Sequence, residues 1–392
     1  MALTVFISPA SAAPSPPRIH GGPDALGVPR YDFSTNSNAC GPCPVALAAV
    51  QQADATRYPD ASYVALRAQI AALHGVDGQR VLLAGSASEF IFRITAWVVQ
   101  RGGRDGGHFG KGNVCLPPHS YDDYAQAAQA WGWGVSAQLD DAQLVWVCEP
   151  SSPLGAPHAS WPRWVTETFI NHDQHITTVR PELPVLSSVE GVEGSAGILS
   201  VPVVLDRAYE PLRLSGAPRL TAAQLEKVWQ LWTPNKALGL TGVRAAYVIA
   251  PLGADAAVAA LERLCPSWPL GAHGVAMLQS WVQPEVQGWL TESLHSLRRW
   301  KAMQIDMLNG LGWTCLPSDA NFFCARPGLG CDLKQLRAAG IKLRDTASFG
   351  LPGYVRVSVQ PPAAQDALKM AWQAIAISPA PPSGPPSDKG MT

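Results

Sequence analysis

The chain is poor in charged residues. Asp, Glu, Lys and Arg make up 15% of its 392 residues, and the net charge is -1. Without a basic surplus, nucleic acid is not expected as the main partner. No apolar run reaches the roughly 18 residues that a membrane helix needs, so we expect no membrane contact. The eight cysteines are scattered, unlike those of a disulfide scaffold. We therefore predict a soluble, cytoplasmic protein.

Helical patterns alternate with short apolar runs through the first two thirds of the chain. This alternation predicts an α/β fold with a mostly parallel sheet that helices cover on both faces. The helical patterns span residues 46–52, 62–74, 90–100 and 121–131, and the apolar runs span 80–84, 113–116, 144–148, 201–205, 228–232 and 245–250.

The pattern changes after Cys265–Pro269. A long helical stretch at 275–311 precedes strand candidates at 322–324 and 354–359 and a helix at 333–339, which predicts a smaller α+β domain. We place a flexible tail at 1–17, an N-terminal arm at 18–50, a large domain at 51–265, a small domain at 266–377 and a second tail at 378–392. A low-complexity insertion is expected at 178–200.

The sequence Cys40-Gly-Pro-Cys43 spells a redox motif. That chemistry needs a cysteine at a helix N-terminus after a strand–helix–strand unit, but only 39 residues, rich in turn formers, precede Cys40. A turn that leads into a helix is therefore the favoured interpretation, and a thioredoxin-like oxidoreductase is a remote alternative. No second pair of ligands follows at the short spacing of a zinc site, so we expect no metal.

The most informative residues are an acid and a lysine that lie 30 positions apart. Asp206 ends the apolar run Val203-Val-Leu-Asp206, which would place it at the carboxyl edge of a sheet, where ligands bind. Lys236 lies in the glycine-containing segment 233–244 and could act as a Schiff-base nucleophile. Each feature has an ordinary alternative: such an aspartate often caps a helix, and a lysine in a loop is usually solvated.

Taken together, Asp206, Tyr209, Lys236 and Arg244 resemble the fold-type I enzymes that use pyridoxal phosphate (PLP), in the class I/II aminotransferase superfamily. The similarity runs from about Arg18 to Ala376 and is greatest to the branch with histidinol-phosphate aminotransferases and threonine-phosphate decarboxylases. It implies a large domain with a mostly parallel seven-stranded sheet and a smaller α+β C-terminal domain.

The resemblance also implies roles for individual residues. Lys236 would bind PLP covalently and move the Cα proton, Asp206 would keep the pyridine nitrogen protonated, and Tyr209 would hydrogen-bond the ring hydroxyl. Arg356, in Ser348-Phe-Gly-Leu-Pro-Gly-Tyr-Val-Arg356, would bind the substrate carboxylate. The residues implied around the phosphate are Ser86, Ala87, Ser88, Thr233, Asn235 and Arg244. The segment with Ser86 also reads as a helix cap, and both interpretations can hold together.

Two further assignments depend on aromatic residues. The segment 117–124 resembles the one whose aromatic side chain stacks on PLP; its spacing from Gly132 favours Tyr124 and leaves Tyr121 possible. Arg57-Tyr58-Pro-Asp resembles the place from which a tyrosine reaches the cofactor phosphate of a neighbouring subunit. The resemblance therefore implies a homodimer.

Two positions depart from the family pattern. Ser152, in Glu149-Pro-Ser-Ser152-Pro-Leu-Gly155, stands where an asparagine usually contacts the PLP ring hydroxyl, and a shorter hydroxyl would reach it through water. Asn235 precedes the lysine where Ser or Thr is common. Both departures concern substrate and rate more than PLP binding.

The predicted activity is amino transfer between an amino acid, possibly phosphorylated as histidinol phosphate is, and a 2-oxo acid. A threonine-phosphate decarboxylase of cobalamin synthesis is the main alternative, and His20-Gly-Gly favours it modestly. A PLP-binding protein without turnover is a remote alternative.

Overall fold

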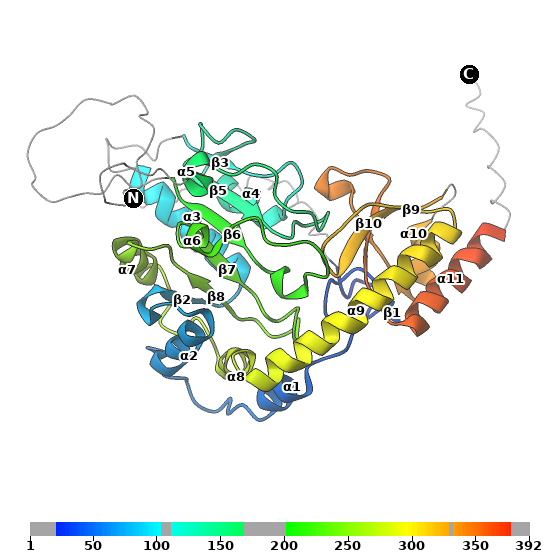
Figure 1. Ribbon diagram of the computed structural model, residues 1–392, viewed down its shortest axis with the longest axis horizontal. Coiled ribbons are helices and arrows are strands. Elements are labelled where there is room, and N and C mark those ends of the chain that lie inside the picture. The colour runs from blue at the N-terminus through cyan, green and yellow to red at the C-terminus, as the bar shows by residue number, and fades with distance from the viewer. Residues whose placement is uncertain (1–20, 103–110, 168–200, 329–331, 378–392) are drawn as a thin grey trace, which may run out of the picture.

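The computed structural model describes residues 21–102, 111–167, 201–328 and 332–377. The tails predicted at 1–17 and 378–392 and the insertion predicted at 178–200 lie outside these residues, as does His20. Figure 1 shows two lobes joined by a long helix, with a large sheet in one lobe and a small sheet in the other. We retain the predicted domain boundaries as a proposal.

Seven strands form the large sheet, in the order β2-β8-β7-β6-β5-β3-β4. Only β8 runs antiparallel to its neighbours, so the sheet is mostly parallel, as predicted. Because both faces are covered, the interior strands are mainly apolar, with exceptions such as Gln230 in β7 and Asp206 at the end of β6. The strands are β2 (Val81–Ala84), β3 (Asn113–Cys115), β4 (Gly134–Ser136), β5 (Leu144–Cys148), β6 (Val203–Asp206), β7 (Trp229–Trp232) and β8 (Ala246–Ile249).

Helices cover the two faces of this sheet and bury its alternating side chains. One face packs against α3 (Ala87–Gly102), α4 (Asp122–Gln129) and α7 (Asp255–Arg263). The other packs against α1 (Pro44–Gln51), α2 (Val64–His74) and α8 (Ala272–Trp281) over β2 and β8, and against the short α5 (Arg163–Thr166) and α6 (Ala222–Leu225) over β5 and β6.

The smaller lobe is built on an antiparallel sheet in the order β12-β13-β10-β9. Its strands are β9 (Thr314–Cys315), β10 (Phe322–Arg326), β12 (Arg344–Asp345) and β13 (Val355–Ser358), and its helices are α10 (Leu333–Ala338) and α11 (Pro362–Ile377). The N-terminal arm reaches this lobe, because β1 (Tyr31–Asp32) pairs in parallel with β11 (Ile341–Lys342).

The single helix predicted over 275–311 is wrong. The chain forms two helices there, α8 and α9 (Pro284–Gly310), separated at Val282 and Gln283. Proline cannot donate the helical hydrogen bond and its ring clashes with the preceding turn, so Pro284 begins a helix and does not continue one.

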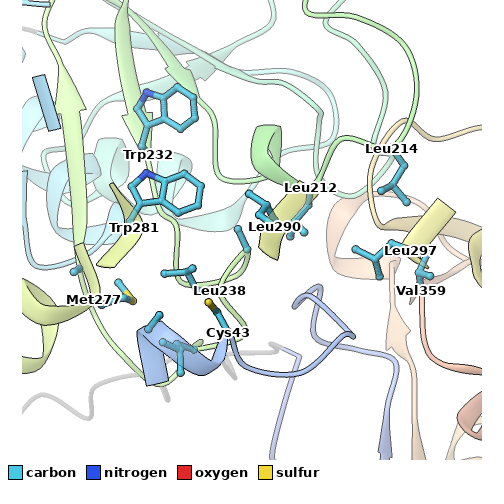
Figure 2. Packing of buried hydrophobic residues seen from close by; sticks show 14 of the residues in the cluster. Cys43, Leu212, Leu214, Trp232, Leu238, Met277, Trp281, Leu290, Leu297 and Val359 are labelled. Carbon is cyan, nitrogen blue, oxygen red and sulfur yellow. The ribbon is translucent and has the colours of Figure 1, made fainter. Parts of the chain in front are cut away.

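Helix α9 joins the two lobes through one hydrophobic cluster. Figure 2 shows Leu290 and Leu297 of this helix among residues from both lobes. Cys43, at the start of α1, and Val359, just after β13, belong to the same cluster. Burying these side chains together favours a fixed placement of the lobes, in which the loops after β5 and β6 contact β10 of the small sheet.

Candidate active site

Asp206 is the last residue of β6 and is 5% exposed. Each oxygen of its carboxylate accepts one hydrogen bond: Oδ2 from Tyr124 Oη at 2.6 Å, and Oδ1 from the Ala208 backbone N–H at 2.9 Å. Burial raises the pKa of Asp206, while these two donors and the positive charge of Lys236 act in the opposite direction. The carboxylate is thus fixed in place at the edge of the sheet.

Lys236 lies in the loop between β7 and β8 and is half-buried. The N-terminal arm holds this loop, because the Asn38 N–H donates to Lys236 O at 2.9 Å and the Cys43 N–H donates to Leu238 O at 2.8 Å. Gly239 allows this close approach; it has a φ of 69°, and a Cβ there would lie 2.6 Å from Gly41 O. In the described part of the chain Lys236 forms no ion pair, so its amine is left available for a ligand.

Tyr209 contacts Lys236, the N-terminal arm and the small lobe. The Lys236 Nζ lies 5.2 Å from the centre of the Tyr209 ring, and that ring packs edge-on against Phe322 of β10. The Tyr209 hydroxyl accepts a hydrogen bond from Asn36 Nδ2 at 3.3 Å. Because this bond uses a lone pair of the hydroxyl, the Tyr209 proton remains free to be donated.

Arg356 of β13 is 7% exposed and has no carboxylate partner among the described residues. Its two terminal nitrogens donate to Ser152 Oγ at 3.1 Å and to Ser34 O at 3.2 Å. Nε is buried and has no acceptor. A buried guanidinium without a counter-ion is a suitable site for a carboxylate ligand.

The residues predicted around a phosphate lie at the start of α3 and in the loop after β7. Ser86 Oγ accepts from the Glu89 N–H at 3.1 Å, so this segment does cap the helix. Ser88 Oγ lies 3.4 Å from Tyr121 Oη. Burial raises the pKa of Tyr121, and the charge of the exposed Arg244 acts in the opposite direction. This interaction indicates that the two side chains are close.

The structure corrects the role predicted for Tyr124. This residue is fully buried, and its ring is stacked on Trp146 of β5, with centroids 4.5 Å apart and an angle of 12° between the planes. Its hydroxyl bonds Asp206, and because the side chain is fully buried no face of the ring is exposed to a ligand. Tyr121, the other predicted candidate, is half-buried beside Ser88, and its stacking on a ligand stays a prediction.

Tyr58 is not among the residues brought together here. It is 79% exposed and stacks on Trp268, with ring centroids 4.6 Å apart. The redox alternative gains no support, because burial raises the pKa of Cys40 and Cys43 is buried at the N-cap of α1. The described residues contain no group of three or more His, Cys, Asp or Glu side chains that could hold a metal ion.

Sequence reasoning missed three residues that contact the site. Arg344 of β12 pairs directly across from Arg356, and both guanidinium groups lie over the Phe349 ring, at 4.9 and 5.5 Å. His119 Nδ1 lies 2.6 Å from Phe349 O. Asn36 contacts Tyr209, as described above. These contacts depend on strand register and on how the lobes meet, and no local sequence pattern marks them.

The fold is shared with solved aminotransferase structures. Residues 199–375 match the family described as "Aminotransferase class I and II". The match covers slightly less than half of the chain and is a similarity to that family.

Named relatives extend the similarity over most of the chain. Histidinol-phosphate aminotransferase 1 of Thiobacillus denitrificans is 27% identical over 355 residues, which cover 85% of this chain and 83% of that protein. The crystal structure of histidinol-phosphate aminotransferase from Sinorhizobium meliloti in complex with pyridoxal-5'-phosphate has a TM-score of 0.64 at 20% identity and covers 87% and 89% of the two chains.

A decarboxylase shares the fold as well. The structure of L-threonine-O-3-phosphate decarboxylase from Porphyromonas gingivalis has a TM-score of 0.59 at 18% identity and covers 83% of this chain and 93% of that one. At this identity the likeness concerns the fold alone. In the described residues no helix is both long enough and apolar enough to cross a membrane.

Proposed function

We propose that this protein is a PLP-dependent aminotransferase that moves an amino group between an amino acid and a 2-oxo acid. The observation that carries the proposal is the half-buried Lys236 amine, which forms no salt bridge with any described residue and lies at the same sheet edge as the buried carboxylate of Asp206. A Schiff-base lysine and an acid for a pyridine nitrogen are the two groups that PLP chemistry requires of a protein.

The residues at this edge fit such a cofactor. Several buried polar atoms there have no hydrogen-bond partner among the described residues, which is costly unless a ligand supplies one. These atoms are Asn36 Oδ1, Thr233 Oγ1, Asn235 Oδ1 and Arg356 Nε. Thr233 and Asn235 lie in the same loop as Lys236, whereas Asn36 contacts Tyr209 and Arg356 contacts Ser152.

When bound, PLP supplies an electron-withdrawing ring beside the carbon that carries the amino group. The protein's own residues do the rest. Lys236 holds the cofactor and moves a proton at the substrate Cα, Asp206 keeps a proton on the ring nitrogen, and Arg356 binds the substrate α-carboxylate. Ser86, Ser88, Thr233, Asn235, Arg244 and the Ala87 backbone would hold the phosphate, at the N-terminus of α3.

Ser152 Oγ accepts a hydrogen bond from Arg356, so its own proton remains free for the ring hydroxyl of a cofactor. We propose that Ser152 orients this arginine, and that Tyr209, oriented by Asn36, serves the ring hydroxyl.

The finer substrate class follows from Arg344. Two guanidinium groups on facing positions of neighbouring strands repel each other, which is tolerated where an anion binds between them. We therefore propose a donor that places a dianionic phosphate or a second carboxylate between the two arginines. Histidinol phosphate, which the names of the curated relatives include, has a phosphate in place of an α-carboxylate and would present that phosphate to the pair.

Homodimer formation and a cytoplasmic location are parts of the same proposal. The exposed Tyr58 and Trp268 form an aromatic patch that a second copy could cover. The seven cysteines in the described residues are all free thiols, as is usual in a reducing compartment.

The test is the visible spectrum of the protein with PLP, before and after L-glutamate is added. We expect a yellow band that bleaches as the amino group moves to the cofactor. Lys236→Ala should lose the covalent band and turnover by several orders of magnitude, whereas Lys369→Ala, at an exposed position of α11, should behave as the unmodified protein.

Other outcomes select among the alternatives. A band that glutamate does not change, together with release of carbon dioxide from threonine phosphate, would assign the decarboxylase activity. A band with neither reaction would leave a PLP-binding protein without turnover. Absence of any band at saturating PLP would contradict all three.

A further inference from the structure

Tyr124 makes the shortest polar contact to Asp206. The hydroxyl of this α4 residue lies 2.6 Å from Asp206 Oδ2. The ring is held from below by Trp146, to which it is nearly parallel, and no part of the side chain reaches solvent. The donor is therefore fixed by packing and not by the ligand, so it is in place before any cofactor arrives.

In the hydrogen bond between these two residues, Tyr124 is always the donor and Asp206 the acceptor. Burial, followed by the charge of Asp206, raises the pKa of Tyr124 well above 10. The phenol therefore keeps its proton at all working pH values and can only donate to the carboxylate. A hydrogen bond to an ionised acceptor is about twice as strong as a neutral one and favours the ionised form.

We propose that Tyr124 is a positioning residue that keeps the Asp206 carboxylate ionised and aimed at the cofactor's ring nitrogen. This inference rests on the proposed function, since it assigns to Tyr124 an indirect role in PLP binding. The alternative is a purely structural role, in which the hydroxyl bonds the nearest acceptor and the ring fills space between α4 and the sheet.

A double-mutant cycle on PLP affinity separates these interpretations. Tyr124→Phe keeps the ring and its stacking on Trp146 and removes only the donor. We expect the PLP dissociation constant, measured by spectroscopic titration, to rise roughly tenfold or more. In an Asp206→Asn background, where no charge remains to be stabilised, the same substitution should change this constant by less than about twofold.

Tyr121→Phe is the matched control. It removes a hydroxyl from the neighbouring tyrosine, which faces Ser88 and not Asp206. Any loss of PLP affinity that it causes should be the same factor in both backgrounds. Equal effects of Tyr124→Phe in both backgrounds, or no effect in either, would overturn the inference while wild-type PLP binding stands. Failure of the wild-type protein to bind PLP would instead overturn the proposed function.

A pH series gives a second readout. The titratable groups facing Asp206 are Tyr124 of α4, Cys148 of β5 and Lys236 after β7. Loss of the Tyr124 donor raises the pKa of Asp206, so PLP affinity in the phenylalanine variant should begin to fall at a higher pH than in the wild type as the solution is acidified. Superimposable pH profiles would contradict the proposal.

Discussion

Arg344 and Arg356 present two positive charges to one small space. Both are buried, at 3% and 7% exposure, and they face each other across β12 and β13. Burial and then the charge of Arg356 lower the pKa of Arg344, while the charges of Asp122 and Asp345 act in the opposite direction. An anion bound between them would relieve this repulsion, so these residues should set the preference for the amino donor.

We expect Arg344→Gln to raise the KM for glutamate and histidinol phosphate by roughly ten- to a hundredfold, since a charge-assisted hydrogen bond is lost. The KM for alanine, which carries one carboxylate, should change by less than about threefold. Steady-state kinetics with the three donors provides the measurement, and Arg299→Gln on the exposed face of α9 is the control. An equal loss for all donors would mean that Arg344 only supports Arg356.

The sequence was sufficient to place the principal residues of the candidate site at one edge of the fold. Asp206 ends an apolar strand, and strand ends of a parallel sheet share an edge, so its position follows from local pattern. Tyr124 and Tyr121 could not be distinguished in this way. Tyr121 is the N-cap of α4 and Tyr124 lies in its first turn, and only the packing of α4 on β5 decides which one enters the core.

At the scale of elements, periodicity identified most strands and helices of the large sheet. It overlooked the interruption before Pro284, because the apolar spacing continues across it while the backbone cannot. The pairing of β12 with β13 was not predictable either: two-residue strands carry no periodic signal, and their register follows from the lobe around them.

Helix α2 carries a pH-dependent contribution to stability. His74, its last residue, lies 2.8 Å from Tyr247 Oη, and burial, followed by the charge of Arg207, lowers its pKa from 6.5 to about 4. The unfolded chain therefore takes up this proton at a higher pH than the folded chain. The contribution of this residue to the free energy of unfolding is complete above pH 6.5. About 3 kcal/mol of it is lost as the pH falls towards 4.

His74→Gln, which cannot titrate, should reduce the difference between the unfolding free energies at pH 7.5 and pH 4.5 by about 2–3 kcal/mol. Urea denaturation at both pH values provides the measurement. His273→Gln, at an exposed position of α8, should leave that difference as in the wild type. An unchanged difference in the His74 variant would show that this residue is not the source.

At the scale of the whole molecule, one side chain bridges the loops of the two sheets over the site. His119 follows β3 of the large sheet, and its Nδ1 bonds Phe349 O between β12 and β13 of the small one. Phe349 in turn lies under both arginines. The bond thus ties the arginine pair to the large lobe.

We expect His119→Ala to raise the KM for the amino donor by roughly threefold to tenfold, on the scale of one lost hydrogen bond, with little change in PLP affinity. His119→Asn should behave nearly as the wild type, because its amide nitrogen can occupy the place of Nδ1. Donor KM and PLP dissociation constants of both variants test this. Equal defects in the two variants would exclude the hydrogen bond as the cause.

The pairing of β1 with β11 has a consequence for how the protein is made. The arm leaves the ribosome first, but its partner strand follows roughly 300 residues later, which at about 5–20 residues per second is some 15–60 seconds of synthesis. Over that time the arm has no strand to pair with, although Lys236 and Asp206 have already emerged. The nascent chain therefore carries the lysine before it carries the completed pocket, and a chain truncated before β11 should bind the cofactor poorly even though both residues are present.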